Sequence, residues 1–246
     1  MVIVTSDHGP GPYAGRKAKS SLNQLFEMEK KDGHFARGPF RGAKFSIYEG
    51  GFRVPFIVKW PGIVKAKSSS DKNISLMDLM ATFADMTDFE LGDKGPDSFS
   101  FLPILKSPNA PSNRKTYIVA SGNSYSIGEG DWKLIMTPSS GTPVTAFWEI
   151  PPFEKTAWRE AIEKYGKQPK SLKELESVEF VQLYNLSEDI EGQNNFAEDN
   201  PEKVKKLFSI IWKQVANGRT TEGGKLNNDW EVIPNFFSPP SFVLNK

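Results

Sequence analysis

The most regular pattern in the chain predicts an amphipathic helix between residues 200 and 218. Asn200 is a frequent residue type at a helix N-cap, Pro201 suits the first helical position, and Gly218 is a typical stop signal. The apolar residues between them recur at helical spacing: Val204, Leu207, Phe208, Ile211 and Val215. A helix with one apolar stripe needs an apolar surface to cover that stripe. The fold must therefore supply such a surface.

Short strand patterns after residue 115 can provide it. Residues 117–120, 132–136 and 181–184 are apolar runs separated by turn residues, which favours an antiparallel sheet. Residues 156–165 predict a charged helix between two of these strands. We therefore expect a sheet packed on the last helix.

The first 114 residues have a different pattern. Val2–Val4 predicts a short buried strand, residues 52–60 predict a second strand, and residues 9–43 read as a long surface loop with a short helix at 21–28. Residues 75–86 predict a helix with Ser75 as its cap and Asp78 three residues on. Four residues of this helix are expected to share its buried face: Leu76, Leu79, Met80 and Phe83.

Composition excludes several classes of protein. The 246 residues include 31 basic and 30 acidic side chains, so no strong field indicates nucleic-acid binding. The apolar runs are too short for a membrane span, and the first residues resemble a strand rather than a signal peptide. The absence of cysteine excludes disulfides and a thiolate nucleophile.

Asp7 and His8 directly follow the first predicted strand. Polar residues at the carboxyl end of an α/β strand lie where ligands often bind. A carboxylate is a hard oxygen donor and an imidazole is a common metal ligand. By themselves the two residues fit a hydrogen-bonded turn as well as half of a metal site.

The stretch RGAKFSIYEGGFRVPFIVKWPG at residues 41–62 is more specific. It resembles the pattern R-G-x-K, Y-E-G-G-x-R-V-P and W-P-G of the formylglycine-dependent sulfatases, in the alkaline phosphatase superfamily. TSDHG at residues 5–9 is similar to the upstream motif of that family. Further similarities, in the same order as in the family, are DSF at 97–99 (with the usual glycine replaced), GDWKLI at 130–135 and LYNLSEDIE at 183–191.

The resemblance implies a fold and a set of site residues. The fold would be the C-terminal part of the sulfatase α/β domain over residues 1–114, then a small α+β subdomain with an antiparallel sheet and a C-terminal helix over residues 115–246. Asp7 matches a ligand of a divalent metal, commonly calcium, and His8 matches the next ligand position, which leaves manganese or zinc open. Lys44 matches the lysine that contacts the sulfate group and stabilises charge during catalysis. His34, in the preceding loop, is a candidate second contact with the substrate.

The family's C/S-x-P-x-R motif, whose first residue becomes formylglycine, is absent from the sequence. The resemblance therefore implies the C-terminal half of a sulfuric ester hydrolase, inactive by itself. We expect it to meet sulfate esters in a complete enzyme, and to pair with a missing N-terminal half or self-associate through an exposed sheet edge. The sequence does not indicate a compartment; family members are often periplasmic or secreted.

Two alternatives stay open at this point. A phosphoester or phosphonate hydrolase of the same superfamily also uses an Asp-His pair, although Arg41, Lys44 and the Tyr48–Gly51 motif favour the sulfatase. A non-catalytic module derived from a sulfatase would keep the fold without the chemistry. Glu49 and Arg53 are expected to brace the turn as an ion pair or through backbone hydrogen bonds.

Overall fold

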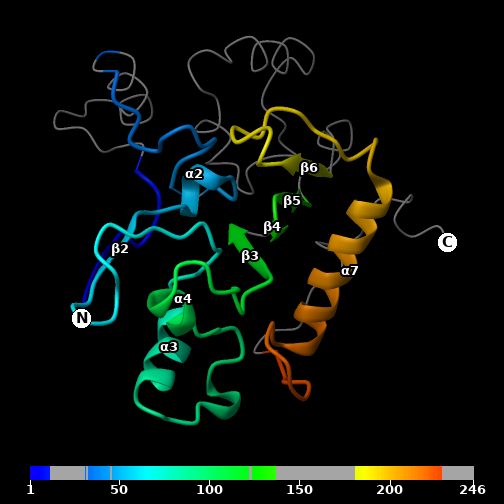
Figure 1. Cartoon of the computed structure of the whole chain (residues 1–246). Helices are drawn as coiled ribbons and strands as arrows, with labels where there is room; N and C mark the ends of the chain where they lie inside the picture. Colours follow the sequence, from blue (N-terminus) through cyan, green and yellow to red (C-terminus); the bar gives the residue numbers. More distant parts are fainter. Residues whose placement is uncertain (12–30, 32, 45, 122–123, 137–180, 229–246) are drawn as a thin grey trace.

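The computed structural model describes residues 1–11, 31, 33–44, 46–121, 124–136 and 181–228. Within these residues the chain forms two antiparallel sheets with helices around them (Figure 1). The helices predicted at residues 21–28 and 156–165 lie outside this part of the chain. None of the described helices is long and apolar enough to cross a membrane.

The first sheet is a ribbon of two strands, β1 (Val2–Thr5) and β2 (Phe56–Lys59), with Val4 opposite Ile57. Both strands were predicted, but the prediction that the first strand is buried is wrong. Val4 is 57% exposed, and its partner Ile57 in β2 is 61% exposed. Because Val4 and Ile57 lie directly opposite each other in the ribbon, their side chains point to the same face. In the described structure no element covers that face. The second strand also begins later than predicted, because Glu49–Phe52 form the short helix α2.

Helix α3 (Asp78–Met86) begins three residues after the predicted start. The Asp78 carboxylate accepts a hydrogen bond from the Ser75 N–H at 2.8 Å, which is one half of the predicted capping arrangement. The predicted buried face is wrong, since Met80 is 48% exposed and Phe83 44% exposed. Instead the helix buries Asp78 and Thr82, because both are hydrogen-bonded within the fold. A 3-10 helix (Gly92–Lys94) and helix α4 (Leu102–Lys106) follow.

The second sheet has four antiparallel strands in sequential order: β3 (Thr116–Ser121), β4 (Ser124–Glu129), β5 (Trp132–Ile135) and β6 (Gln182–Asn185). This confirms the predicted antiparallel sheet. Strand β4 is not among the predicted strands, because serine and glycine alternate with its apolar residues and weaken the pattern.

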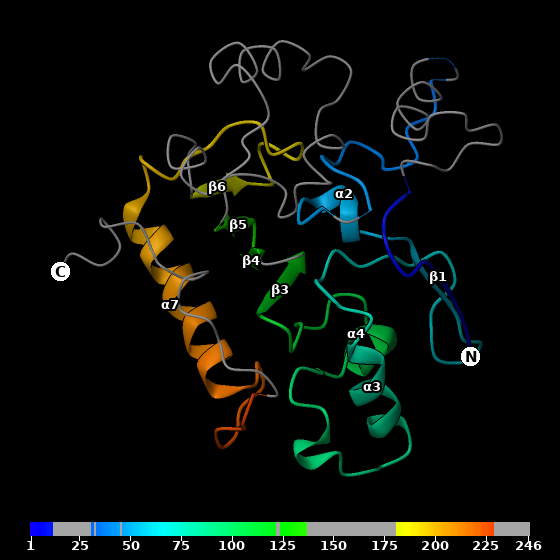
Figure 2. The ribbon, with the colours of Figure 1, turned by 180° about the vertical axis from the view of Figure 1, so that it is seen from behind.

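Helix α7 (Pro201–Asn217) packs on this sheet, as predicted. Its buried residues Val204, Leu207 and Ile211 join Leu134 and Leu183 of the sheet in one core cluster. Gly218 ends the helix in the left-handed conformation, with φ of 64°. The Asn200 side chain does not cap the helix, because its amide donates to the Phe196 carbonyl. Figure 2, from behind, shows α7 and β1 at opposite sides of the molecule.

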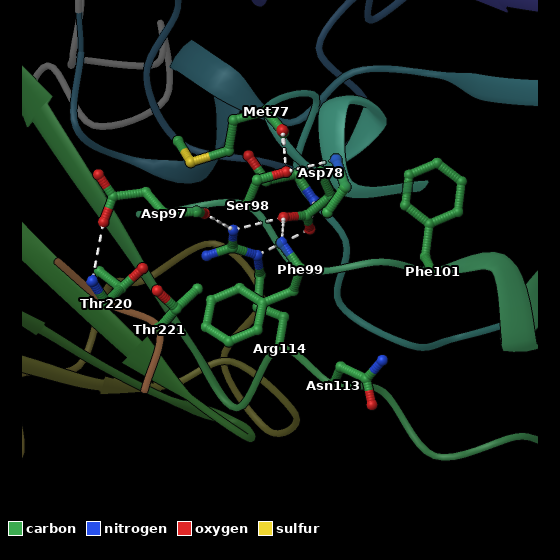
Figure 3. Close-up of polar contacts among 12 residues, drawn as sticks. Met77, Asp78, Asp97, Ser98, Phe99, Phe101, Asn113, Arg114, Thr220 and Thr221 are labelled. Carbon is green, nitrogen blue, oxygen red and sulfur yellow. Dashed lines mark hydrogen bonds and ion pairs between the residues drawn. The ribbon is translucent and has the colours of Figure 1, made fainter. Parts of the chain in front are cut away.

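A network of polar contacts around Asp78 and Asp97 adjoins the predicted boundary between the two segments of the chain, and one of its hydrogen bonds crosses it. Arg114 donates to both carboxylate oxygens of Asp78, at 2.8 and 2.6 Å, and to the Asp97 carbonyl at 2.6 Å (Figure 3). The Asp97 carboxylate in turn accepts the Thr220 N–H after α7. The boundary between residues 114 and 115 stays a prediction, and these contacts cross or adjoin it.

Candidate functional site

The turn that follows β1 lies directly against helix α2. The Gly9 N–H donates to the Gly51 carbonyl at 2.9 Å. A Cβ atom on Gly9 would lie 1.8 Å from the Gly50 carbonyl oxygen, which no side chain tolerates. Glycine at position 9 therefore allows the Asp7-His8 turn to touch the helix through its backbone.

Lys44 lies in a second segment that contacts the same turn. Its N–H donates to the Pro10 carbonyl at 3.0 Å, next to the Asp7-His8 turn. The Arg41 carbonyl, three residues earlier, accepts the Gly50 N–H of α2 at 2.7 Å. Lys44 is half-buried. The backbone thus brings together three residues predicted as site residues: Asp7, His8 and Lys44.

The side chains of Asp7 and His8 also meet. His8 Nε2 is 3.0 Å from Asp7 Oδ2, and His8 Nδ1 is 2.8 Å from the Gly9 carbonyl oxygen. A carbonyl and a carboxylate both only accept, so each of these contacts is a hydrogen bond where the ring nitrogen concerned carries the hydrogen, which depends on the tautomer. Fixing one ring nitrogen in this way is a common means of orienting a metal-binding histidine.

The described residues do not complete a metal site. Among them no group of three or more His, Cys, Asp or Glu side chains is placed to hold an ion. His34 is exposed in a different loop. No hydrogen bond or ion pair described in this part of the chain joins it to Asp7, His8 or Lys44. The structure therefore brings together the backbones of three of the four predicted site residues, and no described contact links His34 to them.

A cluster of buried polar and charged side chains joins helix α2 to the second sheet. The predicted ion pair between Glu49 and Arg53 is confirmed, at 3.5 Å, but a closer partner is Lys133 of β5, whose Nζ is 2.7 Å from Glu49 Oε1. The Tyr117 hydroxyl also donates to Glu49, at 3.3 Å. Burial lowers the pKa of Lys133, against the opposing effect of Glu49, and burial followed by Glu49 raises the pKa of Tyr117.

Sequence reasoning missed Lys133. The one available signal was a lysine within the apolar run WKLIM at residues 132–136, where an exposed strand position is the usual interpretation. The second sheet contacts the 41–53 segment elsewhere too. Arg41 donates to the Tyr184 hydroxyl and the Gly192 carbonyl, and the Tyr48 hydroxyl donates to Gln182.

Comparison with known proteins identifies relatives of this chain. Residues 1–89 match the family model described as Sulfatase. The N-acetylgalactosamine-6-O-sulfatase of Bacteroides thetaiotaomicron is 32% identical over 214 residues, which cover 86% of this chain and 35% of that protein. The ulvan-active sulfatase of Formosa agariphila is 25% identical, over 78% of this chain and 38% of that protein.

Solved structures agree with these matches. A structure from work on the metabolism of multiple glycosaminoglycans by Bacteroides thetaiotaomicron superposes with a TM-score of 0.64 and 28% identity, covering 86% of this chain and 38% of that one. A sulfatase from Pseudoalteromonas sp. has the same fold, with a TM-score of 0.56 at 16% identity, over 87% of this chain and 36% of its own. The chain thus spans between a third and two fifths of the length of these relatives. It is a partial member of the sulfatase family, with the alkaline-phosphatase-like α/β fold of that family.

Proposed function

We propose that this chain is part of a sulfuric ester hydrolase and supplies some of the contacts to its metal and its sulfate group. In this proposal Asp7 and His8 are metal ligands, and Lys44 binds the sulfate. The observation that supports it best is the pair of backbone contacts, Gly9 to Gly51 and Lys44 to Pro10, that bring the two segments together.

Sulfatases as a family use a divalent metal ion. Calcium is the metal we propose, with manganese or zinc as alternatives because His8 offers nitrogen. Calcium takes about six to eight oxygen ligands. At the turn after β1, Asp7 offers one carboxylate and His8 one imidazole, so these residues fit such an ion only as part of a larger ligand set. We therefore assign no chemical step to the metal in this chain.

Lys44 has a role that does not depend on the metal. The sulfuryl oxygens gain negative charge as a sulfate ester is cleaved, and a fixed ammonium group beside them offsets that charge. The hydrogen bond from the Lys44 N–H to the Pro10 carbonyl sets the starting point of this side chain next to the Asp7-His8 turn. His34 stays a prediction as a second substrate contact, because its exposed position lends it no support.

The sequence contains neither cysteine nor Ser-x-Pro-x-Arg, so it lacks the nucleophile that the family resemblance calls for. We propose that the chain alone does not hydrolyse sulfate esters and that another sulfatase segment completes the site. The exposed apolar side chains of the β1–β2 ribbon and α3 are the surface proposed for that segment or for self-association. We also propose a periplasmic or secreted location, from the habit of the family.

The test is to complete the enzyme with a polypeptide from a related sulfatase that carries the C/S-x-P-x-R motif. The reconstituted protein is assayed on an aryl sulfate and on the matching aryl phosphate. We expect preference for the sulfate, loss of turnover in Lys44→Ala, and unchanged turnover in Lys65→Ala, an exposed lysine outside the site. Preference for the phosphate would favour a phosphoester hydrolase, and no turnover of either ester would favour a non-catalytic module.

A further inference from the structure

The strand β5 places a fully buried lysine beneath the segment that supports the candidate site. Lys133 is 1% exposed, and its Nζ donates to the Ile47 carbonyl at 2.6 Å and to Glu49 Oε1 at 2.7 Å. The same ammonium group lies 4.3 Å from the centre of the Phe52 ring. All three partners belong to residues 47–52, which include helix α2. One side chain of the second sheet thus holds both ends of this short segment.

A buried ion pair of this kind is weak evidence for a contribution to stability. Removing two charges from water is unfavourable, and well-packed apolar residues often stabilise a fold as well or better. Glu49 also accepts the Tyr117 hydroxyl, so two strands of the second sheet converge on one carboxylate of α2. The geometry fixes the position and orientation of α2 relative to that sheet.

The position of α2 determines where the candidate ligands lie. The Asp7-His8 turn contacts α2 through Gly9, and no space for a side chain separates the two backbones. The segment with Lys44 contacts α2 through the hydrogen bond from Gly50 to Arg41. A shift of α2 must therefore move or release both segments.

We propose that Lys133 is a positioning residue of the sulfatase site: by holding Ile47 and Glu49 it keeps the Asp7-His8 turn and the Lys44 segment in register. This inference rests on the proposed roles of Asp7, His8 and Lys44. The second sheet then supports the site through Lys133, although none of the proposed ligands belongs to that sheet.

The first measurement is amide hydrogen exchange by NMR on the 246-residue chain, which does not depend on any metal role. The reference is the Phe196 amide, which donates to the Leu183 carbonyl of β6. In Lys133→Met we expect the Gly9 and Lys44 amides to exchange several-fold faster relative to this reference. Leu207→Ala is the control, because it destabilises the core under α7 without touching α2. An unchanged exchange ratio in Lys133→Met would overturn the proposal.

The second measurement is broadening of histidine ring signals by Mn²⁺. The chain has two histidines, so His34 serves as an internal reference for His8. We expect Mn²⁺ to broaden His8 selectively in the parent, and about tenfold more metal to be needed in Lys133→Met, the usual effect of losing an outer support. Absence of selective broadening in the parent would contradict the proposed metal role, while the exchange measurement would still decide the role of Lys133.

A second variant covers the case in which Lys133→Met does not fold. The double change Lys133→Met with Glu49→Met removes both buried charges and keeps apolar side chains of similar length. Folding should survive this exchange, because apolar replacement of a buried ion pair is often neutral or stabilising. We expect faster Gly9 exchange and weaker Mn²⁺ broadening of His8 to persist. Parent-like exchange in a folded double variant would show that the pair contributes stability alone.

Discussion

Arg114→Met should destabilise the chain far more than a surface substitution of the same type. Arg114 and Asp78 form a bidentate pair with side chains 3% and 1% exposed. Removing one partner of a buried pair leaves an uncompensated charge and lowers the free energy of unfolding by about 3–5 kcal/mol. Asp78 keeps two backbone donors, the Ser75 and Phe99 N–H groups, so we expect the lower end, about 3 kcal/mol.

The assay is urea unfolding followed by circular dichroism, together with a thermal scan. For a protein of this size, about 3 kcal/mol corresponds to a fall in Tm of about 6–12 °C. Arg53→Met is the matched control, since Arg53 is half exposed and its 3.5 Å pair with Glu49 should contribute at most about 1 kcal/mol. Adding Asp78→Asn to Arg114→Met should recover part of the loss, because the buried charge is gone. A loss within about 1 kcal/mol of the control would contradict the role given to the buried Arg114–Asp78 pair.

Three further changes test other parts of the structure. Gly9→Ala should weaken the contact between the Asp7-His8 turn and α2 and destabilise by about 1–3 kcal/mol, whereas Gly224→Ala, where a Cβ meets nothing, should have little effect in the same urea assay. Tyr117→Phe should make stability fall less steeply between about pH 9.5 and 11. Because its pKa is raised, Tyr117 stays protonated in the folded state at a pH where the unfolded state loses this proton. The stability due to this phenol is therefore present below about pH 10 and is lost as the pH rises further. Equal slopes of unfolding free energy against pH for parent and variant would contradict this. Ile57→Glu should reduce self-association measured by light scattering, while Ile63→Glu, exposed outside the ribbon, should not.

Local periodicity predicted most of the regular elements correctly. The apolar stripe of α7 and the strands β3, β5 and β6 were predicted because each repeats a simple pattern against a single core. The prediction for α3 identified the helix but not its buried face. Hydrophobicity alone placed Met80 and Phe83 inside, whereas hydrogen bonds to distant residues bury Asp78 and Thr82.

The candidate site was predictable only in part. Motif resemblance proposed Asp7, His8 and Lys44 as site residues, and the structure brings their backbones together through the hydrogen bonds from Gly9 to Gly51 and from Lys44 to Pro10. The pair of Lys133 and Glu49 joins residues 84 positions apart, so no local pattern could reveal it. The exposure of β1 could not be predicted either, because a run of Val and Ile predicts a buried strand whether or not another element covers it.

The most direct test of the account is the turnover of an aryl sulfate by the purified 246-residue chain, with calcium or manganese supplied. We propose that this chain provides metal and sulfate contacts without a nucleophile, and we therefore predict no hydrolysis above the rate without protein. Turnover that follows the chain through purification and is lost in Lys44→Ala would contradict it.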